Sequence, residues 1–225
     1  MKKVISLYDL TGEAMKPWAE AGYECHCFDI QHEGSQVIDG IQYHHADLYD
    51  PATLQAIADE HSDAVFACAF PPCTDLAVSG ARHYASKRET NPLFQIEATY
   101  HATQAAELFE TIGCPYFIEN PVSVLSTLWR KPDHSFHPFE YGRYIPLLQS
   151  EHPRWPEYIA PYDRYTKKTC LWTGNGFTMP DKDAVSAPNG LSTQHLKLGG
   201  KSQRTKDIRS ATPRGFAIAV HKANK

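Results

Sequence analysis

The sequence predicts an α/β fold, with a parallel, doubly wound sheet and a small irregular lobe toward the C-terminus. Over residues 4–118, apolar segments of strand length alternate with segments of helical periodicity, and this alternation is typical of βαβ units. After about residue 130 the alternation stops, and prolines and aromatic residues become frequent. A chain of 225 residues with 42% hydrophobic residues suits one domain with a small appendage.

Short apolar runs predict the strands, and turn residues separate them from the helices. The expected strands are residues 4–8, 23–30, 41–45, 63–69 and 114–118. The first expected helix follows a turn at 9–12, and Gly22 stops it. Two further helices are expected, over 51–60, with Pro51 in the first turn, and over 91–112. Residues 74–90 are rich in Ser, Gly and charge, which predicts a loop.

The C-terminal part of the chain has a different sequence pattern, with many prolines. Six prolines between residues 130 and 165 exclude long helices there. A strand is expected at 169–172, a polar and mobile stretch at 174–206, and a helix at 211–222 with Pro213 in its first turn. The expected organisation is a main body over 1–130, a small irregular, basic region over 131–210, and a terminal helix over 211–225 that returns to the main body.

The net charge of −4 is unevenly distributed along the chain. Residues 161–225 carry 12 Lys and Arg against 4 Asp and Glu, whereas the other 160 residues carry 10 against 22. A basic C-terminal third is consistent with a face that meets a polyanion. It is equally consistent with an unevenly charged, solvated surface.

Composition also narrows the cellular setting. No apolar run approaches the roughly 20 residues of a membrane span, so no membrane partner is expected. The six cysteines lack the dense spacing of a disulfide scaffold, which favours a reducing compartment and a cytoplasmic location. The triplet Cys25-His26-Cys27, even with His44 and His45, lacks the usual zinc spacing, and no metal is expected.

Two motifs follow two of the expected buried strands. Pro71-Pro72-Cys73 comes after residues 63–69, and Glu119-Asn120-Pro121 comes after residues 114–118. Open α/β sheets bind ligands at the carboxyl ends of their strands, so a thiol and a carboxylate are expected to meet there. Attack on C6 of a pyrimidine, while a carboxyl group holds the N3 edge, requires this pair. That chemistry activates cytosine for alkylation at C5.

Each of the two side chains also has a plainer interpretation. Free cysteines are usually small buried hydrophobes, as expected for Cys68, Cys114 and Cys170. Glu119 has the alternative of capping a helix that begins near Val122. The two proline residues fix two φ angles before Cys73, and burial would raise the pKa of Glu119 toward neutrality, so the catalytic interpretation is preferred for the pair.

The order of these motifs resembles the C5-cytosine DNA methyltransferase family. The resemblance covers residues 1–130 and about the last 25 residues, and the ending is similar to that of short, phage-type members. It implies a Rossmann-like S-adenosylmethionine-dependent methyltransferase fold, acting in a host cytoplasm. The segments that carry it are Asp9-Leu10-Thr11-Gly12, Asp29, Asp47, Pro71-Pro72-Cys73, Glu119-Asn120-Pro121, Gly199-Gly200-Lys201-Ser202-Gln203-Arg204 and Arg209-Ser210-Ala211-Thr212-Pro213-Arg214-Gly215-Phe216-Ala217.

The resemblance implies roles for individual residues. Cys73 would attack C6, and Glu119, with Asn120 beside it, would hold N3 and the exocyclic amine. Asp29 would bind the ribose hydroxyls of S-adenosylmethionine and Asp47 its adenine amine. The remaining expected cofactor contacts are Leu10, Thr11 and Gly12 in the first turn, together with Ile30, Leu48 and Pro71.

The chain also departs from the family pattern. Ala14 stands where the first turn usually has a second glycine, and Leu10 stands at the usual aromatic position. The Gln-x-Arg-x-Arg element that contacts the base O2 has no clean match. Arg164 and Arg204 are the candidates for that contact, and phosphate contacts or ordinary surface charge are their alternatives.

The interval that reads a DNA sequence in larger members, residues 174–206 here, is short. A sequence-reading module normally buries at least about 600 Å² on DNA. The short interval favours relaxed specificity, a protein partner or oligomer, or a substrate other than long duplex DNA. In duplex DNA the target cytosine must be flipped out of the stack.

Two alternative functions remain open from the sequence. One keeps the pyrimidine activation but changes the substrate to a nucleotide, a single strand or RNA, or changes the transferred group. The other is a non-catalytic protein that binds the cofactor or DNA.

Overall fold

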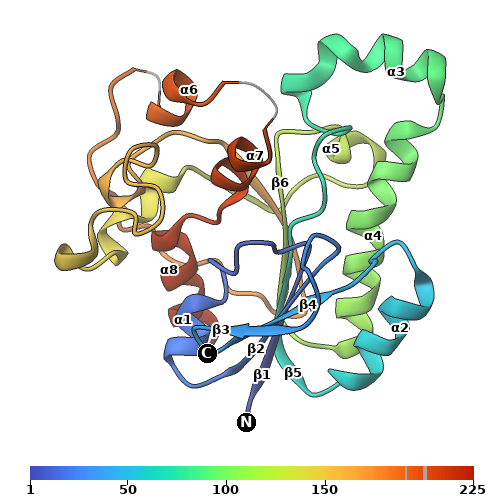
Figure 1. The fold of residues 1–225 in the computed structure, drawn as a ribbon, viewed down its shortest axis with the longest axis horizontal. Helices are drawn as coiled ribbons and strands as arrows, with labels where there is room; N and C mark the ends of the chain where they lie inside the picture. The colour runs from blue at the N-terminus through green and yellow to red at the C-terminus, as the bar shows by residue number, and fades with distance from the viewer. Residues whose placement is uncertain (191, 200–201) are drawn as a thin grey trace.

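The computed structural model describes residues 1–190, 192–199 and 202–225. Within these ranges eight strands form one sheet in the order β3-β4-β2-β1-β5-β6-β8-β7 (Figure 1). Strands β4, β2, β1, β5 and β6 run parallel, while β3, β8 and β7 pair antiparallel to their neighbours. Their bounds are β1 Lys3–Leu7, β2 Glu24–Asp29, β3 Gln36–Ile38, β4 Ile41–His45, β5 Ala64–Ala69, β6 Tyr116–Pro121, β7 His134–Phe136 and β8 Thr169–Gly174.

Helices cover both faces of the sheet, as a doubly wound fold requires. α2 and α4 lie on one face, and α1 and the terminal helix α8 lie together on the other (Figure 1). The helix bounds are α1 Lys16–Glu20, α2 Pro51–Glu60, α3 Tyr84–Thr90, α4 Phe94–Ile112, α5 Leu125–Leu128, α6 Thr193–Lys197, α7 Gln203–Ser210 and α8 Arg214–Asn224. The 3₁₀ turns are η1 Val78–His83, η2 Pro138–Tyr144, η3 Leu147–Gln149 and η4 Pro161–Asp163.

Local sequence explains the elements that deliver the chain to the edge of the sheet. Asp50 caps α2 by accepting from the backbone N–H groups of Ala52 and Thr53. Gly113 ends α4 with φ +81° in the left-handed region, where glycine has no steric penalty. Strand β6 begins shortly after Gly113 and contains Glu119. No helix in the described ranges is both long and apolar enough to cross a membrane.

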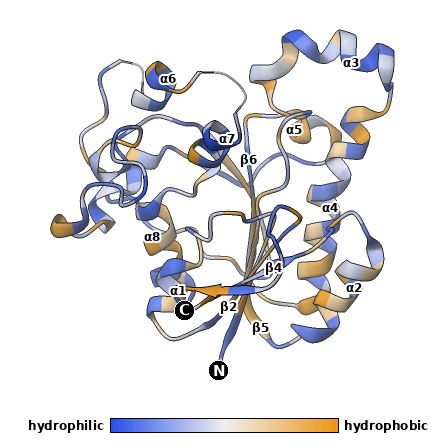
Figure 2. Cartoon of the chain, viewed as in Figure 1, coloured by the Kyte–Doolittle hydropathy of each residue, from blue (hydrophilic) through white to orange (hydrophobic). Residues whose placement is uncertain are grey.

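The C-terminal half contributes more to the sheet than the sequence predicts. Strand β8 pairs with β6 along six residues, and β7 adds a further antiparallel strand. The sheet is therefore mixed, and the expectation of a wholly parallel sheet is wrong at this edge. At the opposite edge the short strand β3, which carries the exposed Val37 and Ile38, was also not predicted (Figure 2).

Two segments expected to be irregular contain helices. Within 74–90, residues 78–90 form η1 and α3, and the Tyr84 hydroxyl donates to the carbonyls of Leu76 and Ala77 at the start of α3. Within 174–206, α6 and the first residues of α7 are helical, and each helix starts at a serine that accepts from the backbone, Ser192 and Ser202. Hydrophilic residues predominate on α3 and α7 (Figure 2), which explains why apolar periodicity did not reveal them.

Candidate active site

The two sequence motifs lie at the ends of neighbouring parallel strands. In the register of β5 and β6, Ala69 stands opposite Ile118, so the chain leaves both strands at the same edge. The side-chain amide of Asn120 donates to the Pro71 carbonyl oxygen at 3.0 Å. This buried hydrogen bond joins the Pro-Pro-Cys turn directly to the residue after Glu119.

Backbone hydrogen bonds continue this connection beyond the strands. The Cys73 carbonyl accepts from the N–H groups of Leu76 and Ala77, at 3.1 and 2.8 Å. The Val78 N–H donates to the Val122 carbonyl at 3.1 Å, and the Val124 N–H donates to the Leu76 carbonyl at 3.0 Å. The loop after Cys73 is thereby fixed against the loop after Glu119.

Cys73 is partly buried, and the charge of Glu119 affects the pKa of its thiol. Burial raises the pKa of the Cys73 thiol, the negative charge of Glu119 raises it further, and the Lys167 ammonium opposes both. The thiol is therefore protonated at neutral pH in this arrangement. A neutral Glu119 would remove one of the two causes, so the protonation states of the pair depend on each other.

Glu119 differs from an ordinary surface carboxylate in its burial and in its raised pKa. Its Oε1 atom is buried and has no hydrogen-bond partner among the described residues. Burial raises the pKa of the Glu119 carboxyl, and Lys167 opposes the shift. A carboxyl group with a raised pKa and an unpaired oxygen is suited to donate a hydrogen bond to a ligand.

Lys167 is the basic residue beside this pair, and sequence reasoning did not select it. It lies two residues before β8, the strand that pairs with β6, and its ammonium donates to the Arg209 carbonyl at 2.9 Å. In the sequence, Lys167 could be noticed only because it precedes an expected strand and follows Arg164 by three residues. Several basic residues share that stretch, so its position does not distinguish Lys167 from the others.

A narrow cavity lies against Glu119. Its lining includes Phe70 at the end of β5, Lys167, and the segment before α8 that contains Thr212 and Pro213. Its volume is about 10 Å³, which is room for about one water molecule. A pyrimidine ring would enter only if this wall moved.

The turn after β1 is fixed by a buried carboxylate. Asp9 accepts from the N–H groups of Thr11 and Gly12, at 3.1 and 2.8 Å, and from the Ser6 hydroxyl at 3.0 Å. Gly12 has φ +65°, and a Cβ at this position would collide with the Tyr43 hydroxyl. Glycine is therefore required here by the backbone conformation and by the packing of Tyr43.

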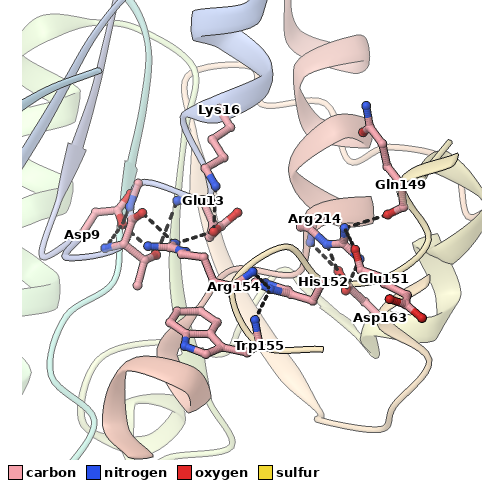
Figure 3. Close-up of polar contacts among 12 residues, drawn as sticks. Asp9, Glu13, Lys16, Gln149, Glu151, His152, Arg154, Trp155, Asp163 and Arg214 are labelled. Atoms are coloured by element: carbon pink, nitrogen blue, oxygen red, sulfur yellow. Dashed lines mark hydrogen bonds and ion pairs between the residues drawn. The ribbon is translucent and has the colours of Figure 1, made fainter. Parts of the chain in front are cut away.

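The same turn contains a second buried carboxylate, Glu13. Its side chain pairs with Lys16 at 3.0 Å and with Arg154, which reaches it from the proline-rich segment (Figure 3). Burial alone would raise the pKa of Glu13, but the charges of Arg154 and Lys16 outweigh it and hold the pKa below its ordinary value. Glu13 is thus an ionised group with two cationic partners.

A cavity near the strand ends has a volume of about 540 Å³, within the roughly 300–1,000 Å³ of small-molecule sites. Of the expected cofactor residues, Leu10 and Thr11 line it, together with Gln31, Tyr43 and Arg154.

The other expected cofactor residues surround the same edge of the sheet. Asp29 is buried at the end of β2 and accepts from the Gln31 N–H at 2.8 Å, while Ile30 is exposed. Asp47 accepts from the Tyr49 N–H at 3.0 Å. Leu48 and Pro71 are buried. The lining of the 540 Å³ cavity does not include Gly12, Asp29, Ile30, Asp47, Leu48 or Pro71.

The two arginines considered for the base contact have other partners in the structure. Arg164 is exposed and donates to the Ser186 hydroxyl at 3.4 Å. The guanidinium of Arg204 lies over the Tyr158 ring, 5.5 Å from its centroid. Of the tail motif that resembles the phage-type ending, Gly200 and Lys201 lie outside the described residues.

The histidines near β2 form a stack rather than a ligand set. His26 Nδ1 lies 3.0 Å from His44 Nε2, and His26 Nε2 lies 3.1 Å from a Glu24 oxygen. In the described part of the chain, no group of three or more His, Cys, Asp or Glu side chains is arranged to hold a metal ion.

Comparisons with known proteins give a slight structural likeness. No family model matches the sequence, and no curated protein matches it. Among solved structures, the chain is similar to a candidate DNA modification methyltransferase encoded within a prophage (E. coli), with a TM-score of 0.45 and 12% sequence identity. The likeness covers 77% of this chain and 46% of that protein, so this chain spans about half of the other's length.

Proposed function

We propose that the protein transfers a methyl group from S-adenosylmethionine to C5 of cytosine in DNA, with Cys73 as nucleophile. The observation that carries the proposal is the connection of two strand ends by the Asn120–Pro71 hydrogen bond. It supports a thiol and a carboxyl group acting on one ring, because Glu119 is close enough to Cys73 for its charge to raise the pKa of the thiol.

The proposed chemistry assigns a step to each side chain. The Cys73 thiol gives up its proton to solvent, its sulfur forms a bond to C6 of the cytosine, and the electron pair of the C5–C6 double bond becomes available at C5. Glu119 donates a hydrogen bond or proton to N3, which lowers the cost of that displacement. After C5 has taken the methyl group, solvent accepts the proton from C5, the double bond is restored, Cys73 leaves C6 as a thiolate, and Glu119 regains its proton from N3. We assign to Lys167 the contact on the carbonyl side of the base.

The first turn fits the proposed cofactor. S-adenosylmethionine, when bound, supplies an electrophilic methyl group. The 540 Å³ cavity is of suitable size, the turn of Leu10 and Thr11 forms part of its wall, and the Asp29 carboxylate lies at the end of β2, where nucleotide-binding folds place a group that binds ribose.

The surroundings of the site support a nucleic-acid substrate. α3 stands on one side of the carboxyl end of the sheet, and α6 and α7 stand on the other (Figure 1). Exposed basic residues occur on both sides, among them Arg88 on α3 and Arg204 and Lys206 on α7. Contacts from these residues to phosphates would make the affinity depend strongly on salt. In a duplex the base must be extruded from the stack before Cys73 can reach C6.

Methyl transfer from labelled S-adenosylmethionine tests the proposal. The acceptors are duplex DNA, single-stranded DNA, RNA and free deoxycytidine triphosphate, and the products are digested to nucleosides and separated. The expected product is 5-methylcytosine in DNA. Transfer only to RNA or to the free nucleotide would overturn the assignment of DNA as substrate. A chain that binds the cofactor but methylates none of the four would overturn the assignment as an enzyme.

A further inference from the structure

The Glu13 carboxylate is buried more completely than a structural ion pair requires. Its side chain has no exposed surface, and its Oε2 atom is buried without a hydrogen-bond partner among the described residues. Burying a carboxylate is costly unless cations compensate it. The compensation comes from Lys16 on the adjoining helix and from Arg154, which is 141 residues away in sequence.

Arg154 contacts the turn at two points. Its Nη2 atom donates to the Thr11 carbonyl at 3.0 Å and also pairs with the Glu13 carboxylate. One guanidinium therefore bridges the backbone at Thr11 and the side chain at Glu13 (Figure 3). A shift of Arg154 would change both contacts of the turn that we assign to the cofactor.

Contacts with the neighbouring residues Trp155 and His152 hold Arg154 in place. Its guanidinium stacks on the Trp155 ring at 4.6 Å from the centroid. The His152 Nδ1 atom accepts from the backbone N–H groups of Arg154 and Trp155, both at 3.2 Å. The side chain thus approaches the turn from a fixed backbone, which reduces the entropy lost on forming the two contacts.

The other end of this segment is attached to the terminal helix. Arg214, in the first turn of α8, donates to the carbonyls of Gln149, Ser150 and Glu151 at 2.9–3.0 Å. It also pairs with the buried Asp163 at 3.3 Å. Residues 149–155 therefore connect the first turn to the start of α8, directly after the Thr212 and Pro213 wall of the Glu119 cavity (Figure 3).

We propose that Arg154 is a positioning residue for S-adenosylmethionine, which acts by holding the Thr11–Glu13 turn through the Glu13 carboxylate. The inference rests on the proposed function, because it takes that turn as the cofactor site. Arg154 lines the 540 Å³ cavity, so its loss changes the cavity wall and releases the turn. The step that joins Cys73 to the base is on other strands and stays intact.

The test measures cofactor binding and turnover in matched variants. Arg154→Ala is expected to weaken S-adenosylmethionine binding and raise its KM by about 10-fold, while kcat at saturating cofactor changes by less than about 2-fold. Arg154→Lys keeps the charge but not the forked geometry, so an intermediate KM is expected. Arg143→Ala, which removes an exposed pair with Asp183 at 3.9 Å, is the control and should change neither constant.

A double-variant cycle separates positioning from general destabilisation. If Arg154 acts through Glu13, then Glu13→Gln combined with Arg154→Gln should weaken binding no more than either single change. Additive losses, or an unchanged KM with a lowered kcat in both Arg154→Ala and Arg154→Lys, would overturn the inference while the proposed function stands. A wild-type chain that binds no S-adenosylmethionine would overturn the proposed function and, with it, this role.

Discussion

Two glutamates with buried carboxyl oxygens, at the same edge of the sheet, have pKa values shifted in opposite directions. Glu13 has two cationic partners that hold its pKa below the ordinary value. Glu119 has an unpartnered buried oxygen, and burial raises its pKa despite the nearby Lys167. The anionic form of the side chain is therefore favoured in the first turn, whereas beside Cys73 burial favours the protonated form, which can donate a hydrogen bond.

The difference separates the residues that fix the backbone of the site from those to which we assign the reaction. An ionised group with two partners fixes the backbone around it, as Glu13 does for the turn. A carboxyl group with an unused oxygen in a confined space has its hydrogen-bonding capacity available for a ligand. Cys73 belongs to the second environment, since burial and Glu119 raise the pKa of its thiol.

The largest expected effect is the loss of the nucleophile. Cys73→Ala should reduce methyl transfer by at least about 10³-fold, because no other group in the site would form the bond to C6. Cys114→Ala, which changes a buried core cysteine, is the control and should keep activity. Turnover measured with labelled cofactor would refute the role of Cys73 if the two variants were equally active.

The reacting carboxyl group comes next. Glu119→Gln should lower kcat by about 10²–10⁴-fold, because the amide cannot transfer a proton at N3. Steady-state rates should show little change in cofactor KM. The control is Glu110→Gln, which removes an exposed carboxylate bonded to Tyr116; a loss of similar size in this variant would show that the Glu119 effect is structural.

A buried histidine tests whether burial governs protonation away from the site. His61 packs on His26, with Phe28, His44, Glu24, Glu60 and Lys3 nearby. Burial first, and then the charge of His26, lower the pKa of His61 to about 4. Because the folded chain prefers neutral His61, stability is kept above the unfolded pKa near 6.5 and lost as the pH falls from there toward 4, by on the order of 3 kcal/mol.

Urea unfolding between pH 7 and pH 4 measures that loss. His61→Gln should flatten the pH dependence, while His83→Gln, at an exposed histidine, should leave it unchanged. Equal pH slopes in all three proteins would contradict the role of burial.

The smallest expected effects test the comparison of the two glutamates directly. At pH 8, Glu13→Gln should destabilise the fold by about 1–2 kcal/mol, because it removes an anion whose lowered pKa favours the folded state above the unfolded pKa. Glu119→Gln should stabilise it by about 1 kcal/mol, since a raised pKa makes ionisation at pH 8 unfavourable for folding. Thermal unfolding that shifts both midpoints in the same direction would contradict the contrast.

The meeting of the Pro71-Pro72-Cys73 and Glu119-Asn120-Pro121 motifs at one edge of the sheet could be predicted from the chain because its signals are local. Two prolines after an apolar run mark the turn before Cys73, and an apolar run likewise leads into Glu119. The general α/β class followed from the same alternation. These features depend on residues within a few positions of one another, where chain geometry is restrictive.

The contacts that cross the chain could not be predicted in this way. Arg154 and Glu13 are far apart in sequence, and only the folded path of the proline-rich segment brings them together. Lys167 was overlooked because its role depends on the antiparallel pairing of β8 with β6. Helix α3 was expected to be a loop because its residues are mostly hydrophilic, and the hydrogen bonds from the Tyr84 hydroxyl to the carbonyls of Leu76 and Ala77 are not encoded in composition.

Covalent trapping is the most direct measurement of the central claim that Cys73 bonds to the base. Duplex DNA containing 5-fluorocytosine should form a complex with the wild-type protein in the presence of S-adenosylmethionine, because fluorine cannot leave C5 as a proton does. The account predicts an adduct that survives denaturation, maps to Cys73 by peptide mass analysis and is absent in Cys73→Ser. Methyl transfer to ordinary cytosine without any adduct on the fluorinated duplex, or an adduct that persists in Cys73→Ser, would contradict it.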